Sequence, residues 1–200
     1  MRKLFLRIAY AFTLVPPIER QLHHRASHVR KHGALLFVRT TNTTSDSEVF
    51  MRRAMELAIK NVRAGKGGPF SALVVKSGKI IAQGTNLVTS TNDPTAHAEI
   101  IAIRAACKKL KHFELKGCEI FATCEPCPMC LGAIYWARLE RIYFAANSAD
   151  AAAIGFDDSF IYSELKKPAE TRVIPAAQLL RKDALAVFRE WELNPNKIKY

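Results

Sequence analysis

Cysteine is sparse in this chain, with five among 200 residues, and glycine and proline contribute only nine each. Three of the five cysteines fall at three-residue intervals over 124–130, which is a metal-type spacing rather than a disulfide framework and favours a reducing compartment. The apolar stretch over 4–15 is far too short to span a bilayer, and there is no internal repeat or low-complexity linker. These absences exclude a disulfide-stapled secreted module, a repeat array and a membrane-spanning helix in that stretch. With 49% hydrophobic residues, the chain can instead bury a sizeable core in one main domain.

Acidic residues are nearly missing from the first 44 positions, where one glutamate stands against eight Lys and Arg, a net charge of +7. Residues 45–200 hold 22 basic and 17 acidic residues, a net charge of only +5. The overall charge of +12 therefore does not indicate a nucleic-acid-binding domain, because most of it lies in residues 1–44. We expect residues 1–44 to be a basic, poorly ordered extension. An organellar transit peptide and a start codon placed too far upstream remain open; a secretory signal lacks its A-x-A site.

Two short motifs carry the chemistry: H-A-E at 97–99 and T-C-E-P-C-P-M-C at 123–130. His97, Cys127 and Cys130 supply three soft ligands, which leaves a tetrahedral Zn²⁺ one position for water or hydroxide. Glu99 follows the histidine by two residues and can move protons instead of binding metal. A His-x-Glu followed by Pro-Cys-x-x-Cys is the signature of zinc-dependent nucleobase deaminases. The motifs thus predict hydrolytic deamination at one zinc per subunit.

Other metal sites compete with this interpretation because Cys124 extends the run to C-x-x-C-x-x-C. An iron–sulfur cluster would need a fourth cysteine soon afterwards, and none follows Cys130. A structural zinc would use four protein ligands, with Cys124 as the candidate fourth. We favour the open catalytic site and expect Cys124, Cys107 and Cys118 to be ordinary buried thiols.

From position 45 the pattern is that of a compact α/β domain. A helix with several N-cap candidates is expected over 45–64, and a last helix over 179–193 precedes the tail. Between them the pattern predicts two paired strands over 72–75 and 79–82. They are followed by a helix over 97–107, a strand over 119–123, a helix over 127–138 and a strand over 141–145, and the two helices carry the two motifs. This order implies an α/β sandwich with a mixed sheet, and ligand sites lie at strand ends in such sheets.

The H-A-E and P-C-x-x-C motifs resemble those of the cytidine deaminase superfamily. The likeness begins near position 50, includes G-G-P-F at 67–70 and F-D-D-S-F-I-Y at 156–162, and runs to position 200. The F-D-D-S-F-I-Y segment and the terminal Tyr200 narrow it to bacterial guanine deaminases. This resemblance implies a three-layer α/β/α sandwich with a mixed five-stranded sheet. It also implies a cytoplasmic enzyme that converts guanine to xanthine and ammonia.

The same resemblance assigns substrate contacts to Asn86, Asp158, Tyr200, Phe70 and Trp136. An amide can donate and accept toward a purine edge, whereas a carboxylate only accepts, which suits a free ring N–H. Ordinary roles compete: a turn residue for the asparagine, a helix cap for the aspartate, and core packing for the two aromatic residues inside the domain.

The terminal tyrosine implies a homodimer, because in proteins of this kind the C-terminal segment is exchanged and closes the partner's site. The expected partner is thus a small purine base, with no membrane and no nucleic acid. Guanosine, guanine-like triazines and tRNA adenosine remain alternative substrates, and a zinc-stabilised nucleic-acid-binding module is the alternative that is not an enzyme.

Overall fold

The computed structural model describes residues 45–200, and the expected basic extension over residues 1–44 lies outside them. The elements in chain order are α1 (Asp46–Arg63), β1 (Ser71–Lys76), β2 (Lys79–Thr85), α2 (Val88–Thr91), α3 (Ala98–Leu110), β3 (Cys118–Cys124), α4 (Pro128–Trp136), β4 (Arg141–Ala146), α5 (Ser148–Ala153), α6 (Ser159–Leu165), the short 3₁₀ helix η1 (Ala169–Thr171) and α7 (Arg181–Leu193).

The strands form one mixed sheet in the order β2-β1-β3-β4. β1 runs antiparallel to both β2 and β3, whereas β3 and β4 are parallel. The predicted pairing of the first two strands is confirmed, and a tight turn joins them at Ser77 and Gly78, which have φ values of 47° and 72°. Positive φ at both central residues is what a tight two-residue hairpin requires.

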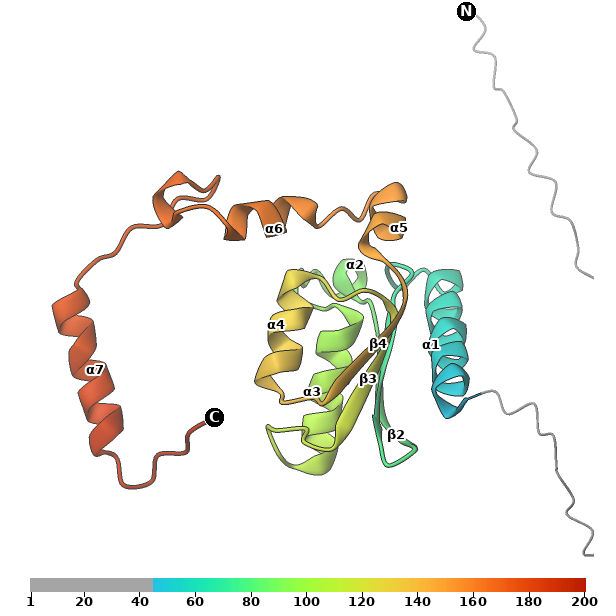
Figure 1. Cartoon of the computed structure of the whole chain (residues 1–200), viewed down its shortest axis with the longest axis horizontal. Coiled ribbons are helices and arrows are strands. Elements are labelled where there is room, and N and C mark those ends of the chain that lie inside the picture. The colour runs from blue at the N-terminus through green and yellow to red at the C-terminus, as the bar shows by residue number, and fades with distance from the viewer. Residues whose placement is uncertain (1–44) are drawn as a thin grey trace, which may run out of the picture. The chain divides into compact units, whose positions relative to one another are not determined.

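Helices cover both faces of the sheet, so the predicted three-layer sandwich is confirmed (Figure 1). On one face, Ala54 of α1 packs with Leu73 and Phe121 of the central strands. On the other face, α3 and α4 contribute Ala102 and Ile134 to the larger core. Both central strands are almost fully buried, which explains their continuous apolar character.

The expectation of a five-stranded sheet was wrong for the described part of the chain, which contains four strands. The reason lies directly after β4. The Asn147 side chain accepts a hydrogen bond from the Asp150 N–H, and the Asp150 carboxylate accepts one from the Asn147 N–H. This capping box begins α5 in an alanine-rich segment, so the chain turns into helix where a further strand could have started.

A close approach between β2 and α3 fixes the start of α3 over the sheet. A side chain at Gly84 would place its Cβ 2.2 Å from the Ala98 carbonyl oxygen and 2.6 Å from the Ala102 nitrogen. Only glycine allows this contact. This contact sets how closely the first turn of α3, which carries the H-A-E motif, packs on the sheet.

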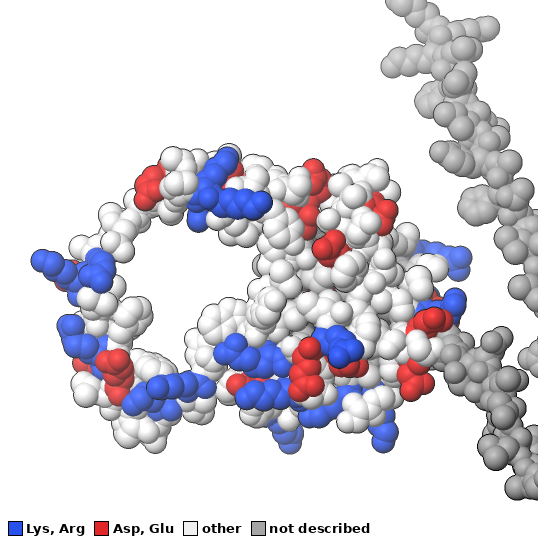
Figure 2. Space-filling view, viewed as in Figure 1, with Lys and Arg blue, Asp and Glu red and all other residues white. Residues whose placement is uncertain are grey.

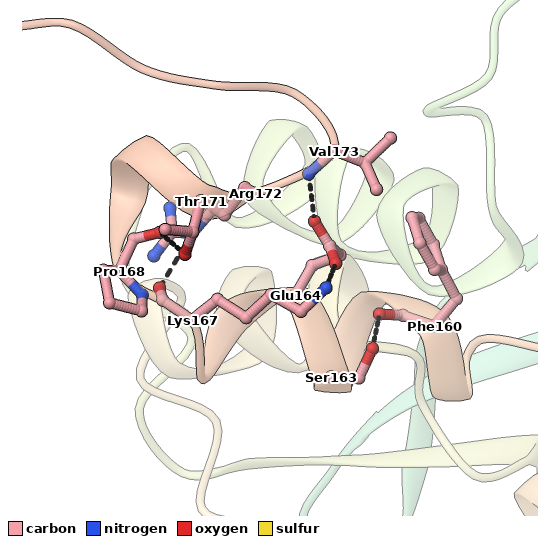
Figure 3. A network of polar contacts seen from close by, with 8 residues as sticks. All are labelled: Phe160, Ser163, Glu164, Lys167, Pro168, Thr171, Arg172 and Val173. Atoms are coloured by element: carbon pink, nitrogen blue, oxygen red, sulfur yellow. Dashed lines mark hydrogen bonds and ion pairs between the residues drawn. The ribbon is translucent and has the colours of Figure 1, made fainter.

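The turn after α6 is held by Glu164, whose carboxylate accepts hydrogen bonds from the Val173 N–H and the Lys167 ammonium (Figure 3). The Arg172 guanidinium also donates to the Lys167 carbonyl at 3.2 Å, which closes the turn around η1. Beyond it, α7 has no buried residue. Within residues 45–200, no helix has both the length and the apolar character needed to cross a bilayer.

Candidate active site

Three candidate metal ligands meet where α3 and α4 begin. His97 immediately precedes α3, Cys127 immediately precedes α4, and Cys130 lies in the first turn of α4. The His97 Nδ1 atom is 3.5 Å from the Sγ atom of each cysteine. The ligand atoms of all three lie within 4.8 Å of one another. Two helix starts therefore assemble the predicted ligand set.

This ligand set fits Zn²⁺. With Zn–S and Zn–N bonds of about 2.3 and 2.1 Å, tetrahedral ligand atoms stand roughly 3.6 Å apart. The 3.5 Å separations between His97 and the two cysteines match that edge length. One imidazole and two thiolates leave a fourth position open, which is the pattern of a catalytic zinc rather than a structural one.

Cys124 stays outside the cluster. It ends β3, and its thiol donates a hydrogen bond to the Asn147 carbonyl with an S···O distance of 3.6 Å. Burial raises the pKa of the Cys124 thiol, so it stays protonated at neutral pH. Within residues 45–200, the three-residue set His97, Cys127 and Cys130 is the metal-type grouping, so neither the iron–sulfur cluster nor the closed four-ligand zinc is formed there.

The surroundings of the ligands favour a thiolate. The neighbouring Cys130 thiol and the His97 ring lower the pKa of Cys127 to about 4, so this sulfur is ionised at neutral pH. The same contact raises the pKa of Cys130, because it then donates its proton to a neighbouring thiolate, and burial adds to the effect. The hydrogen bond to Cys127 raises the pKa of His97. The Cys127 sulfur is thus already a thiolate at the position where a cation would bind.

Glu99 lies in the first turn of α3 and is only 8% exposed. Its side chain lines the same cavity as His97 and Cys127. Burial raises the pKa of its carboxyl group above the usual range, which brings it closer to neutral pH. An acid that accepts and returns protons works best when its pKa approaches the working pH. Its position and surroundings suit the predicted acid–base role.

A cavity of about 490 Å³ opens over these groups. The predicted residues that line it are Phe70, Asn86, His97, Glu99, Cys127 and Asp158. Cys130 is fully buried beside it. The volume is in the range of small-molecule pockets.

Asn86 lies just beyond β2 and is 6% exposed. Its Oδ1 atom accepts hydrogen bonds from the backbone N–H groups of Gly68 at 3.2 Å and Val88 at 3.3 Å. The acceptor side of the amide is therefore occupied, and within the described residues its Nδ2 group has no hydrogen-bond partner. Both interpretations of Asn86, as a turn residue and as a substrate contact, are therefore compatible. Its side-chain oxygen binds the backbone of neighbouring loops, and its NH₂ group can donate a hydrogen bond into the cavity that Asn86 lines.

The paired acids at 157 and 158 have separate roles. The Asp157 carboxylate accepts a hydrogen bond from the Ser159 N–H at 2.9 Å and so caps the start of α6. Asp158 makes no such cap bond, although it occupies the N-cap position. Burial, together with the negative charge of Cys127, raises the pKa of the Asp158 carboxyl group. Its carboxylate is thus the member of the pair left available to the cavity.

An aromatic pair forms one wall of the cavity. The Phe70 and Phe156 rings meet edge to face, with their centroids 4.9 Å apart, and both line the cavity. The sequence prediction included Phe70 but not Phe156, although Phe156 begins the F-D-D-S-F-I-Y segment. Glu125, whose carboxylate accepts a hydrogen bond from the Ser148 N–H at 3.0 Å, was also missed. Its place in T-C-E-P-C-P-M-C was the available signal.

Trp136 and Tyr200 lie outside this cavity in the single chain. Trp136 ends α4 and is 63% exposed, and Tyr200 is 74% exposed. Their rings contact each other with centroids 5.9 Å apart, and the Phe113 ring meets the Tyr200 ring edge to face with centroids 6.4 Å apart. The structure therefore does not bring these two residues to the site of their own chain. Their role in substrate binding stays a prediction.

Zinc deaminases combine a His-x-Glu with a Pro-Cys-x-x-Cys around one metal, and here both motifs converge on one cavity. The fold and the site thus define a zinc-dependent deaminase. The chain belongs to the cytidine and deoxycytidylate deaminase family, whose zinc-binding-region model matches residues 44–146.

Relatives within the family are similar over different lengths. The guanine deaminase of Bacillus subtilis is 55% identical over 153 residues, which is 76% of this chain and 98% of the relative. Its crystal structure superposes with a TM-score of 0.75 over the same shares of the two chains. The tRNA-specific adenosine deaminase of Aquifex aeolicus is 41% identical over 99 residues, which is 50% of this chain and 65% of that relative.

Proposed function

We propose that residues 45–200 form a guanine deaminase, which converts guanine and water to xanthine and ammonia. The observation that carries this proposal is the pairing of an available carboxylate, Asp158, with an available amide donor, Asn86, in the cavity over the metal ligands. A carboxylate accepts from a ring N–H of a free base, and the amide NH₂ donates to a purine oxygen or nitrogen. The similarity to the Bacillus subtilis guanine deaminase over nearly its whole length supports the same substrate.

The chain's own groups would divide the reaction among them. His97, Cys127 and Cys130 would hold the zinc, which when bound lowers the pKa of a coordinated water. Glu99 takes a proton from the attacking water and passes it to a ring nitrogen beside C2 of guanine. It then takes the proton of the new C2 hydroxyl group and delivers it to the exocyclic amine. The C2–N bond breaks, ammonia leaves, and the C2 oxygen becomes the carbonyl of xanthine. Phe70 and Phe156 wall the base in and exclude water.

Asp158→Asn is expected to raise KM for guanine about tenfold or more, because a charged acceptor is replaced by a neutral one. The preference for guanine over guanosine is expected to fall as well, since Asp158 would bind the ring N–H that guanosine lacks. In the parent protein, the raised pKa of Asp158 predicts that KM rises on acidification at a higher pH than for an ordinary carboxyl group. Ammonia release from guanine, guanosine, adenine and cytosine across pH measures all three effects.

The matched control is Asp157→Asn, because asparagine also caps a helix and Asp157 already bonds to the Ser159 N–H. We expect KM for guanine to stay within about twofold in this control. An unchanged KM and an unchanged guanine preference in Asp158→Asn would remove Asp158 from the substrate site. Turnover of guanosine in preference to guanine by the parent protein would overturn the proposed substrate.

The alternative substrate is adenosine in tRNA, because relatives with that name match about half of this chain. Residues 45–200 carry 22 basic and 17 acidic residues. On the face drawn in Figure 2, red side chains gather toward the top of the compact part, and the blue ones along its lower edge have red ones among them. A tRNA anticodon stem-loop included in the ammonia assay separates the two. A non-catalytic nucleic-acid-binding module would release ammonia from neither substrate.

We further propose that the enzyme is a homodimer whose C-terminal segments are exchanged. α7 leaves large apolar side chains exposed, including Val187 at 66%, Phe188 at 64% and Leu193 at 76%. Such a helix gains little stability from its own chain, and a second copy would cover it. Exchange would also bring Tyr200 to the partner's cavity.

We place this enzyme in the cytoplasm, because its metal-binding thiols need a reducing compartment.

Deletion of residues 181–200 is expected to convert the dimer into a monomer and to raise KM for guanine, because it removes both α7 and Tyr200. Sedimentation velocity gives the mass, and steady-state kinetics gives KM. Deletion of 197–200 alone should keep the dimer and still raise KM. A parent protein that sediments as a monomer at micromolar concentration, or a deletion of 181–200 that remains dimeric, would contradict the exchange.

A further inference from the structure

Asn61, in the last turns of α1, is a buried polar residue that the proposed reaction does not use. It is 5% exposed. Its Nδ2 group donates hydrogen bonds to two backbone carbonyls, that of Asn86 at 2.9 Å and that of Gly68 at 3.3 Å. A buried amide with both N–H bonds directed at main-chain oxygens from different segments holds those segments at a fixed separation.

The two segments are walls of the cavity. The Gly68 N–H donates to the Asn86 Oδ1 atom at 3.2 Å, and the Asn86 N–H donates to the Phe70 carbonyl at 3.0 Å. They also touch directly, because a Cβ at Gly67 would lie 2.2 Å from the Asn86 carbonyl oxygen. The loop 67–70 and Asn86 therefore move as one unit, and Asn61 ties that unit to α1.

This arrangement controls how the Asn86 amide points. Its Oδ1 atom faces the Gly68 N–H only while the loop 67–70 keeps its distance from Asn86. The Asn86 NH₂ group then remains free to donate. Glu99 and the metal ligands depend on a different contact, because α3 and α4 pack on the sheet face opposite α1. A change at Asn61 should therefore alter the orientation of the Asn86 amide and leave the positions of the metal ligands unchanged.

We propose that Asn61 is a positioning residue for substrate binding: by bonding the Asn86 and Gly68 carbonyls, it orients the Asn86 amide toward the purine. The inference rests on the proposed function for its substrate, although the contacts themselves do not depend on it. Loss of the Asn61 amide leaves the buried Asn86 carbonyl and the partly buried Gly68 carbonyl without this donor, and it loosens the unit that presents Asn86 and Phe70.

Asn61→Leu, close in shape but without the donor, tests this. We expect KM for guanine to rise about tenfold, the change that about 1.4 kcal/mol of lost binding produces, with kcat within about twofold. Zinc content should be unchanged. Hydrogen–deuterium exchange should become faster at the backbone N–H groups of Gly68, Asn86 and Val88. Asn61→Ala provides the same measurements if the leucine variant does not fold.

Ser71→Ala is the matched control, because the Ser71 hydroxyl also ties α1 to the sheet through the Ala54 carbonyl but is not part of the cavity lining. It should lower Tm and leave KM unchanged. If Asn61→Leu lowers Tm with KM and exchange at residues 68–88 both unchanged, Asn61 is merely structural and the proposal is overturned. If the parent protein does not deaminate guanine, the proposed function fails, and the exchange measurement alone still decides the role of Asn61.

Discussion

Glu99→Gln is expected to lower kcat for guanine roughly 10²- to 10⁴-fold, the usual contribution of a positioned acid–base group. Glutamine keeps the shape and the hydrogen-bonding capacity of the side chain but can no longer exchange a proton. Because Glu99 is not one of the three metal ligands, zinc content should stay at one per chain. KM should change little, since the residues expected to bind the base are Asn86 and Asp158. Stopped or steady-state assays of ammonia release give kcat, and metal analysis gives the zinc content.

An exposed glutamate provides the control for this substitution. Glu56 on α1 forms a surface pair with Arg53 and lies on the sheet face away from the metal ligands, so Glu56→Gln should leave kcat unchanged. A Glu99→Gln protein that keeps zinc and turns over guanine at the parent rate would show that another group moves the protons. Loss of zinc from that variant would instead assign Glu99 to metal binding.

Removal of zinc by a chelator is the second large effect we expect, with ammonia release falling to background. Three side chains from the starts of α3 and α4 form the site, so the metal joins two helices as well as serving the reaction. An ion present at a thousandfold excess over its dissociation constant stabilises the folded state by about 4 kcal/mol. The metal-free protein should accordingly unfold at a lower Tm. Readdition of Zn²⁺, but not Mg²⁺, should restore both activity and Tm, since Mg²⁺ prefers oxygen ligands.

Two cysteine variants separate a specific site from general thiol binding. Cys127→Ser should prevent zinc from restoring either property, because it removes a ligand whose pKa is lowered to about 4. Cys107→Ser should behave as the parent protein does, since the Cys107 thiol contacts the Phe113 carbonyl and not the metal ligands. Full activity in the zinc-free protein, or an equal loss in both variants, would contradict the proposed site.

The sequence predicted the metal site well because its geometry is local. Residues three apart at a helix start necessarily face the same way, so C-x-x-C at 127–130 could be interpreted without the fold. One detail differed: the helix begins at Pro128, with Cys127 as its N-cap, whereas a helix that starts at Cys127 was expected. A proline at the first helical position explains this, since it has no N–H to lose.

The parts that sequence reasoning missed depend on contacts between distant segments. Asn61 is 25 residues from Asn86 along the chain, and nothing in either local pattern predicts that their groups bond. The edge-to-face pair of Phe70 and Phe156 likewise joins segments from opposite halves of the domain. The fifth strand was expected from resemblance, and the Asn147–Asp150 capping box that begins α5 was a signal available in the sequence but not used.

One measurement tests the central claim most directly: mass spectrometry of the purine product after the zinc-loaded protein acts on guanine in ¹⁸O-labelled water, with ammonia counted in parallel. Hydrolytic deamination predicts xanthine that carries one ¹⁸O atom, with one ammonia released for each xanthine formed, and product formation by the Glu99→Gln protein that is slower by about a hundredfold or more. Intact guanine in the presence of zinc, or xanthine without the label, would contradict the account.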